Sequence, residues 1–178
     1  MACLARFIGF RGLTLSFLLF ITLIFSSSVA NADTIVRFDT PLGAFNVQLY
    51  DTATPITVEN FLNYVANGRY NGPFMHRLVM NPGLEIIQGG GFMLGQPVED
   101  VLTFPPIVNE FDPLRSNVRG TIAMAKTSDP DSATSQFFFN LGDNSTALDN
   151  PLNSGGFTVF GEVIGNGMDV LDAMGALE

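Results

Sequence analysis

The chain has 178 residues, with 8 Lys and Arg against 17 Asp and Glu, and its formal net charge at pH 7 is −9. This acidity argues against a nucleic-acid partner, because phosphates select basic surfaces. Solubility explains the charge better than a cationic partner does.

Residues 1–32 have the features of an export signal and are set apart from the fold. Arg6 and Arg11 give a positive start, residues 13–25 are an apolar stretch of thirteen, and Ala30-Asn31-Ala32 supplies the small residues of a cleavage site. A transmembrane anchor is the alternative, but this stretch is shorter than the roughly 20 residues that a spanning helix needs. We therefore expect a signal peptide that is cleaved after its last alanine.

Cleavage leaves residues 33–178 as one domain with a single core, carrying six cations and seventeen carboxylates, a net charge of −11. The only cysteine, Cys3, leaves with the signal. The domain therefore has no disulfide or thiol nucleophile, although export implies an oxidising compartment. We expect a periplasmic or secreted monomer without a stable membrane anchor.

The domain is predicted to open with a β-hairpin over residues 35–50, since apolar and polar residues alternate on both sides of Pro41-Leu42-Gly43. A helix should follow, because Thr54 can cap it, Pro55 suits its first position and Gly68 stops it. Four apolar residues at helical spacing should cover one end or flank of a sheet: Val58, Phe61, Leu62 and Val65.

Five further runs have the composition of short strands, and a final apolar set has helical spacing. The strands are expected around residues 75–78, 85–88, 121–125, 136–140 and 158–163, and the helix includes Met168, Val170, Leu171 and Met174. Many short strands with two helices predict a mainly β fold, a closed or nearly closed antiparallel barrel capped by helices, since closure removes adhesive edges.

Arg77 stands eleven residues before Gln88, which begins the run Gln88-Gly89-Gly90-Gly91-Phe92. A guanidinium keeps its proton near neutral pH, so Arg77 is a permanent donor and chemistry built on it needs no proton transfer. The glycines lack the Lys-Ser or Lys-Thr of a phosphate loop. They suit a strand that bends or a second backbone that approaches closely.

Neither a catalytic triad nor a metal site is expected. His76 is the only histidine, and it has no serine, cysteine or second histidine beside it in a nucleophile motif. One histidine without cysteine does not supply the ligands of a zinc site. Asp129-Pro130-Asp131 lacks the alternating ligands and the glycine of a calcium loop. We expect no metal and no cofactor, and a structural or supporting role for His76.

Six sequence blocks occur in an order that is specific to one family. They are Phe74-Met75-His76-Arg77, Gln88-Gly89-Gly90-Gly91-Phe92, Asn109-Glu110-Phe111, Gly120-Thr121-Ile122-Ala123-Met124-Ala125, Ser135-Gln136-Phe137-Phe138-Phe139 and Phe157-Thr158-Val159-Phe160-Gly161. Together they resemble the cyclophilin-type peptidyl-prolyl cis-trans isomerases. The resemblance implies an eight-stranded antiparallel barrel with a helix at each end. It also implies an enzyme that acts on proline-containing polypeptides, here as exported proteins fold.

The resemblance also implies roles for individual residues. Arg77 matches the arginine that donates to the twisted prolyl amide, Gln88 the glutamine that bonds the substrate backbone, and Phe138 the floor of the proline pocket. The other substrate-binding positions that it implies are Ile86, Ala125, Lys126, Gln136, Leu148 and Phe157.

Several positions depart from the family pattern. Lys126 replaces a usual asparagine, Phe157 stands where histidine is common, and Leu84 or Glu85 replaces a pocket phenylalanine. Family members continue beyond the position of Glu178 into a last strand, so we expect either a truncated sequence or an open barrel edge. A non-catalytic proline-peptide-binding chaperone or interaction module on the same fold remains the alternative function.

We predict that the exported protein begins at Asp33, because the apolar stretch is too short to remain as an anchor. N-terminal sequencing of protein from the periplasm or the culture medium checks this. A different first residue would move the cleavage site, and retention of Met1 would overturn the export signal.

Overall fold

The structure is a computed structural model that describes residues 33–177, so the predicted signal lies outside the described part. Three helices are present in that range: α1 (Pro55–Ala66), α2 (Ser145–Leu148) and α3 (Gly167–Gly175). The strands are β1 (Ile35–Thr40), β2 (Gly43–Leu49), β3 (Arg77–Asn81), β4 (Leu84–Gly89), β5 (Phe92–Met93), β6 (Glu99–Asp100), β7 (Thr121–Met124), β8 (Phe137–Asn140) and β9 (Val159–Ile164). None of these helices is long and apolar enough to cross a membrane.

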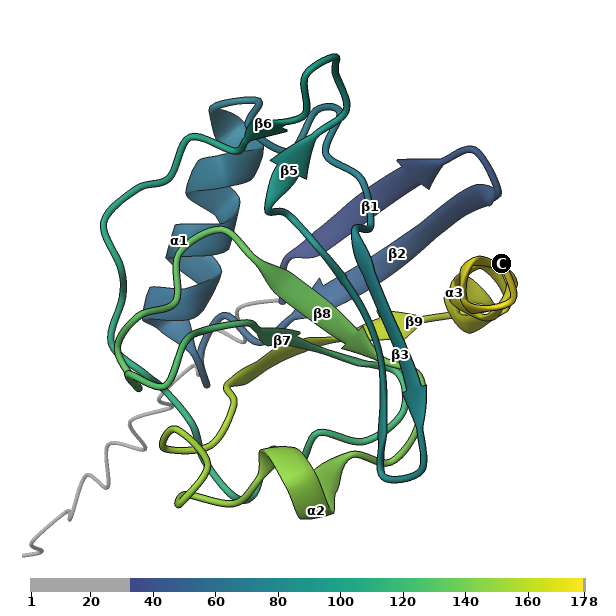
Figure 1. Cartoon of the computed structure of the whole chain (residues 1–178). Helices are drawn as coiled ribbons and strands as arrows, with labels where there is room; N and C mark the ends of the chain where they lie inside the picture. The colour runs from purple at the N-terminus through teal and green to yellow at the C-terminus, as the bar shows by residue number, and fades with distance from the viewer. Residues whose placement is uncertain (1–32, 178) are drawn as a thin grey trace, which may run out of the picture. The chain divides into compact units, whose positions relative to one another are not determined.

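Seven strands form one antiparallel sheet in the order β1-β2-β9-β7-β8-β4-β3, and β5 and β6 form a small second sheet. Figure 1 shows the large sheet strongly curled, with α1 along one side of it and α2 at the end opposite β5 and β6. The edge strands β1 and β3 are not neighbours in this order, so the described residues do not close the barrel. The predicted mainly β fold with an antiparallel, barrel-like sheet is confirmed, whereas closure of the barrel is not. The one-turn α2 and the β5-β6 pair were not predicted, because such short elements leave no periodic pattern.

Alternation along β8 gives the sheet two apolar faces. Phe137 and Phe139 belong to the core that Phe45 and Phe160 also fill. Phe138 points the other way and packs in a separate cluster. This is the division that three successive phenylalanines in a strand predict.

Helix α1 packs on the core with a face that differs in part from the predicted one. Val58 and Phe61 are 3% and 1% exposed, whereas Val65 is 40% exposed, so its predicted burial is wrong. Tyr64, the residue before it, is buried instead. Its hydroxyl accepts the backbone N–H of Phe104 at 2.7 Å, so burial does not leave this polar group without a hydrogen-bond partner.

The N-terminus of α1 is capped by a residue far away in the sequence. Thr54 occupies the N-cap position as predicted, but its side chain makes no capping hydrogen bond, and its hydroxyl donates to the carbonyl of Tyr50 at 3.2 Å instead. The carboxylate of Glu110 accepts the backbone N–H groups of Ile56 at 3.2 Å and Thr57 at 2.7 Å. A negative charge there satisfies free donors of the first turn and interacts favourably with the helix dipole.

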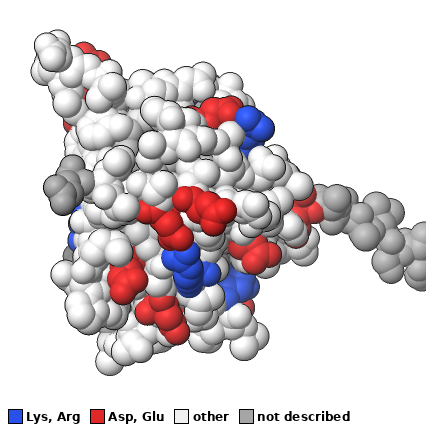
Figure 2. Space-filling model, turned by 90° about the vertical axis from the view of Figure 1, so that its right-hand side faces the viewer, with Lys and Arg blue, Asp and Glu red and all other residues white. Residues whose placement is uncertain are grey.

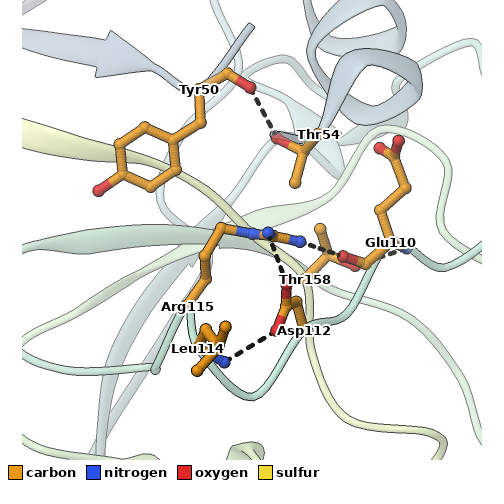
Figure 3. A network of polar contacts seen from close by, with 7 residues as sticks. All are labelled: Tyr50, Thr54, Glu110, Asp112, Leu114, Arg115 and Thr158. Atoms are coloured by element: carbon orange, nitrogen blue, oxygen red, sulfur yellow. Dashed lines mark hydrogen bonds and ion pairs between the residues drawn. The ribbon is translucent and has the colours of Figure 1, made fainter. Parts of the chain in front are cut away.

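The loop that carries Glu110 is held in turn by neighbouring polar groups (Figure 3). Arg115 donates to the backbone carbonyl of Glu110 at 2.8 Å and to the carboxylate of Asp112 at 3.0 Å. The backbone N–H of Glu110 donates to the hydroxyl of Thr158, just before β9, at 3.0 Å. The start of α1 is thereby tied to the sheet through a loop between them.

An apolar hollow of about 650 Å³ lies beside the free edge of β1. Its walls come from β1, α1, residues 70–75 and α3, and they include Val36, Phe38, Phe61, Tyr70, Phe137 and Met174. The walls of this hollow therefore include residues of the main core, among them Phe61 of α1 and Phe137 of β8.

We predict that Glu110→Ala lowers the free energy of unfolding by about 1 kcal/mol, the usual cost of losing a helix cap. Glu110→Gln should cost less, because its amide oxygen still accepts while the charge is lost. Urea unfolding measures both. Glu59→Ala removes an exposed carboxylate from the same helix and is the control, with an expected change within about 0.5 kcal/mol. Equal stabilities for Glu110→Ala and the control would contradict the capping role.

Candidate active site

Strand register places the predicted catalytic residues in one row across the sheet. Arg77 on β3 lies opposite Gln88 on β4, and Gln88 lies opposite Phe138 on β8. The row continues through Ala123 on β7 to Val159 on β9. Directly opposed residues present their side chains on the same face of a sheet. The pairing thus brings together residues that are far apart in the chain.

Hydrogen bonds connect the polar members of this row. Arg77 Nη1 donates to Gln88 Oε1 at 3.0 Å, and Gln88 Nε2 donates to Gln136 Oε1 at 2.7 Å. Gln88 is 8% exposed, while Arg77 is exposed. A buried amide therefore holds a solvent-facing guanidinium, whose remaining N–H groups can reach a ligand.

The apolar members form a cluster on the outer face of the sheet, which we call the outer-face cluster. Its buried members come from β4, β7, β8, α2 and β9, and Ala125, Leu84 and Phe157 pack against it. The ring of Phe157 meets that of Phe138 edge to face, with centroids 6.0 Å apart. The buried members are Ile86, Ala123, Phe138, Leu148 and Val159.

The structure distinguishes the two candidates for the missing pocket phenylalanine. Leu84 packs against the outer-face cluster, on the same strand face as Ile86 and Gln88. Glu85 points to the other face, where its carboxylate lies against Gly142. Of the two, Leu84 is therefore the residue that adds aliphatic surface to the outer-face cluster.

The glycines after Gln88 let two segments approach the site closely. Gly90 has φ +76°, and a Cβ there would lie 2.5 Å from the carbonyl oxygen of Ser135. A Cβ on Gly91 would lie 2.9 Å from the side chain of Gln136 and 3.0 Å from the ring of His76. The predicted close approach of a second backbone is confirmed at Gly90, whereas at Gly91 the neighbours are side chains that would have to shift for a larger residue.

His76 lies beside the polar row. Its ring meets Phe92 edge to face at 4.7 Å, and its Nδ1 is buried with no hydrogen-bond partner among residues 33–177. Burial lowers the pKa of His76, and Arg77 acts in the same direction, while hydrogen bonds with Phe74 and Gln136 oppose the shift. A lowered pKa keeps the imidazole neutral at pH 7, so His76 adds no second charge next to Arg77.

Lys126 lies at the edge of the outer-face cluster. Its Nζ is 4.4 Å from the centroid of the Phe157 ring and donates to the backbone carbonyl of Ser154. Burial lowers the pKa of Lys126, and Asp131 and Asp129 partly offset this. The departure from the family pattern at this position therefore puts a cation on an aromatic wall of the site.

A chain of buried side-chain amides lies under the outer-face cluster, and sequence reasoning missed it. The Asn144 side chain accepts from the backbone N–H of Glu85 at 2.7 Å and donates to the side chain of Asn140 at 2.7 Å. Asn140 donates to the side chain of Asn117 at 3.2 Å, and Asn117 donates to the backbone carbonyl of Phe157 at 3.0 Å. All three asparagines are fully buried.

This amide chain fixes the backbone next to three of the predicted substrate-binding residues. Glu85 precedes Ile86 on β4, and Phe157 is itself an anchor of the chain. Asn117 also donates to the carboxylate of Asp149, which follows Leu148. No motif marks these asparagines, because asparagine is common in loops and its burial depends on the tertiary fold.

Across the described residues, no group of three His, Cys, Asp or Glu side chains is arranged to hold a metal ion. The groups that the site does supply are a guanidinium, an ammonium, an imidazole, two side-chain amides, and aromatic or aliphatic surface. Such a set can bind a peptide and polarise an amide, but it holds no nucleophile placed for covalent chemistry.

Comparisons with known proteins agree with this description. Residues 35–178 match the family described as Cyclophilin type peptidyl-prolyl cis-trans isomerase/CLD. The chain is 46% identical over 146 residues to a peptidyl-prolyl cis-trans isomerase of Acinetobacter baylyi, covering 82% of this chain and 74% of that protein. It is 42% identical over 149 residues to peptidyl-prolyl cis-trans isomerase A of Dickeya dadantii, covering 84% of this chain and 75% of that protein.

A solved structure shows the same fold. The crystal structure of a Cryptosporidium parvum cyclophilin type peptidyl-prolyl cis-trans isomerase matches with a TM-score of 0.63 and 25% sequence identity, covering 82% of this chain and 86% of that one. A second structure of that protein was determined in the presence of the dipeptide Ala-Pro, and it matches with a TM-score of 0.62.

The curled antiparallel sheet and the matches to known proteins point to one class of protein. The chain belongs to the cyclophilin-type peptidyl-prolyl cis-trans isomerase family. The family that the six sequence blocks indicate is thereby confirmed.

We predict that Asn140→Ala lowers both stability and activity. It leaves buried partners in the amide chain unsatisfied, at a cost of about 1–3 kcal/mol, and it loosens the backbone that carries Ile86 and Phe157. Urea unfolding and kcat/KM for a proline peptide measure the two effects. Asn153→Ala removes an exposed asparagine that donates to the Ala147 carbonyl and is the control. A stability of Asn140→Ala equal to that control would contradict the role of the chain.

Proposed function

We propose that this protein accelerates cis-trans isomerisation of X-Pro bonds in polypeptides, and that Arg77 donates a hydrogen bond to the prolyl amide as it twists. The observation that carries the proposal is the shared row: the exposed guanidinium of Arg77 and the ring of Phe138 lie on one face, joined through Gln88. A prolyl ring that packs on the outer-face cluster with its nitrogen turned toward Gln88 would then present that nitrogen to Arg77.

The reaction matches the chemistry of these groups. Rotation about the X-Pro bond breaks amide resonance against a barrier of about 18–20 kcal/mol. No covalent intermediate or proton transfer is involved. As the bond twists, the nitrogen lone pair is released from conjugation and can accept a hydrogen bond. A fixed donor aimed at this nitrogen therefore stabilises the transition state more than the planar ground state.

Gln88 positions the guanidinium in this scheme. Its Oε1 accepts from Arg77 and holds the guanidinium in place before substrate arrives, so little reorganisation is needed during the reaction. Its burial together with its bond to Gln136 fixes the amide. We propose that Gln136 and Ala125 line the path of the substrate backbone, with Ile86, Leu148 and Phe157 around the prolyl ring.

We propose that the clients are exported proteins and that the enzyme works in the periplasm or outside the cell. The signal-like segment at residues 1–32 supports this proposal. Uncatalysed isomerisation takes tens to hundreds of seconds, long enough to limit folding. An enzyme that needs only its own side chains suits a compartment without nucleotides. Acidic and basic side chains are interspersed on the face shown in Figure 2, as on an ordinary soluble surface.

We expect Arg77→Ala to lower kcat/KM for a proline peptide about 10²- to 10³-fold, the usual effect of removing one transition-state donor. The kcat/KM of Arg77→Lys should lie between those of the wild type and Arg77→Ala, because lysine keeps the charge but loses the planar donor geometry. The measurement is a proline isomerisation assay at several enzyme concentrations. Arg37→Ala removes a cation from the edge strand β1 and is the control.

The same assay separates the enzyme from a non-catalytic peptide-binding module on this fold. Peptide binding by the wild type without any rate enhancement would select the binding module. Equal rate enhancement by wild type and Arg77→Ala would leave the isomerase in place but remove Arg77 from its mechanism.

A further inference from the structure

The ammonium group of Lys126 lies within reach of a peptide bound at the outer-face cluster. The centroids of Phe138 and Phe157 are 6.0 Å apart, and Lys126 Nζ lies 4.4 Å from that of Phe157. An extended peptide advances about 3.3 Å per residue. The charge is therefore within about three residues of a proline that packs on Phe138.

The position of this ammonium is fixed by its surroundings. The backbone N–H of Ala125 donates to the carbonyl of Gln136 at 2.9 Å, which anchors the residue before Lys126 beside the polar row. The ammonium itself is held between the Phe157 ring and the carbonyl of Ser154. A lysine restrained in this way loses less side-chain entropy when a ligand binds than a free surface lysine does.

The charge on Lys126 is not neutralised inside the protein. Its side chain takes part in none of the ion pairs found among residues 33–177. Asp131 and Asp129 act on the ammonium only from beyond ion-pair distance, and each accepts a backbone N–H, Asp131 that of Asn109 at 2.8 Å and Asp129 that of Asp131 at 3.0 Å. An ammonium has three N–H donors, and the Ser154 carbonyl uses one. Donors thus remain for a carboxylate on a ligand.

We propose that Lys126 is a specificity-determining residue that makes the site prefer proline segments with an acidic side chain within three residues of the proline. The inference rests on the proposed isomerase function, because it requires the proline to pack on Phe138. Phe157 and Ser154 hold the ammonium on one side of that ring only. The preference should therefore apply to one side of the proline in the peptide sequence and not to the other.

The test uses two sets of proline peptides, with Glu, Gln or Lys placed two residues before or two residues after the proline. For the wild type at low salt, we expect kcat/KM to be about two- to fivefold higher for Glu than for Gln in one set, the size of a partly exposed charge pair. Lys should be worse than Gln in that set, and added salt should reduce both differences. The other set should show no charge preference.

Substitutions identify the residue responsible. Lys126→Gln should remove the preference, and Lys126→Glu should reverse it in favour of the Lys peptide. Arg37→Gln changes the net charge equally but lies on β1, where it pairs with Asp39, and should keep the wild-type preference. Equal values for the three peptides in both sets with wild-type enzyme would overturn the inference, as would a preference that survives in Lys126→Gln.

Failure of the two proposals can be told apart. A wild type that accelerates every peptide without regard to charge keeps the isomerase function and loses only the role of Lys126. If no peptide is accelerated, the isomerase function fails, and equilibrium binding of the same peptides still measures the charge preference. An equal affinity for the Glu, Gln and Lys peptides in that measurement would then overturn the role of Lys126 as well.

Discussion

Antiparallel pairing of β8 with β4 and β7 determines which side chains of these three strands point into the core and which point toward the site. Phe137 and Phe139 fill the interior while Phe138 lies between them on the other face. The same register sets Gln88 opposite Phe138 and Arg77 opposite Gln88. A shift of one residue would move Phe138 into the core and turn the whole row away, because side chains alternate along a strand. Such a shift would also take Phe137 and Phe139 out of the core, so the burial of these two rings opposes it.

The row of polar side chains depends on neutral groups that have fixed positions. Gln88 orients Arg77, and three buried asparagines fix the backbone around Ile86, Leu148 and Phe157. Side-chain amides suit this task, because each both donates and accepts and none carries a charge that burial would penalise. A carboxylate in place of Gln88 would pair with the guanidinium and compete with the substrate for it. The guanidinium of Arg77 thus stays exposed to solvent while a neutral amide holds it.

Much of this arrangement can be predicted from the sequence where local patterns carry the information. The hairpin, α1, α3 and most strands follow from periodicity and from the glycines and prolines between them, and the family blocks indicate the residues of the site. Features that depend on distant contacts escape such reasoning. The cap of α1 comes from Glu110 rather than Thr54, and the burial of Tyr64 depends on the backbone of Phe104. The asparagine chain joins residues from four separate segments, and nothing local marks any of them.

Core and site are the two faces of the same strands, and this affects how the protein responds to heat or denaturant. A lid or a separate domain can open while the rest of a protein stays folded, because few contacts hold it. The part of the row from Gln88 to Val159 has no such independence, since β4, β8, β7 and β9 also carry the interior. Loosening these strands enough to misalign the row disrupts the packing of Phe137 and Phe139 as well. Loss of the active geometry and loss of the fold are therefore one cooperative event.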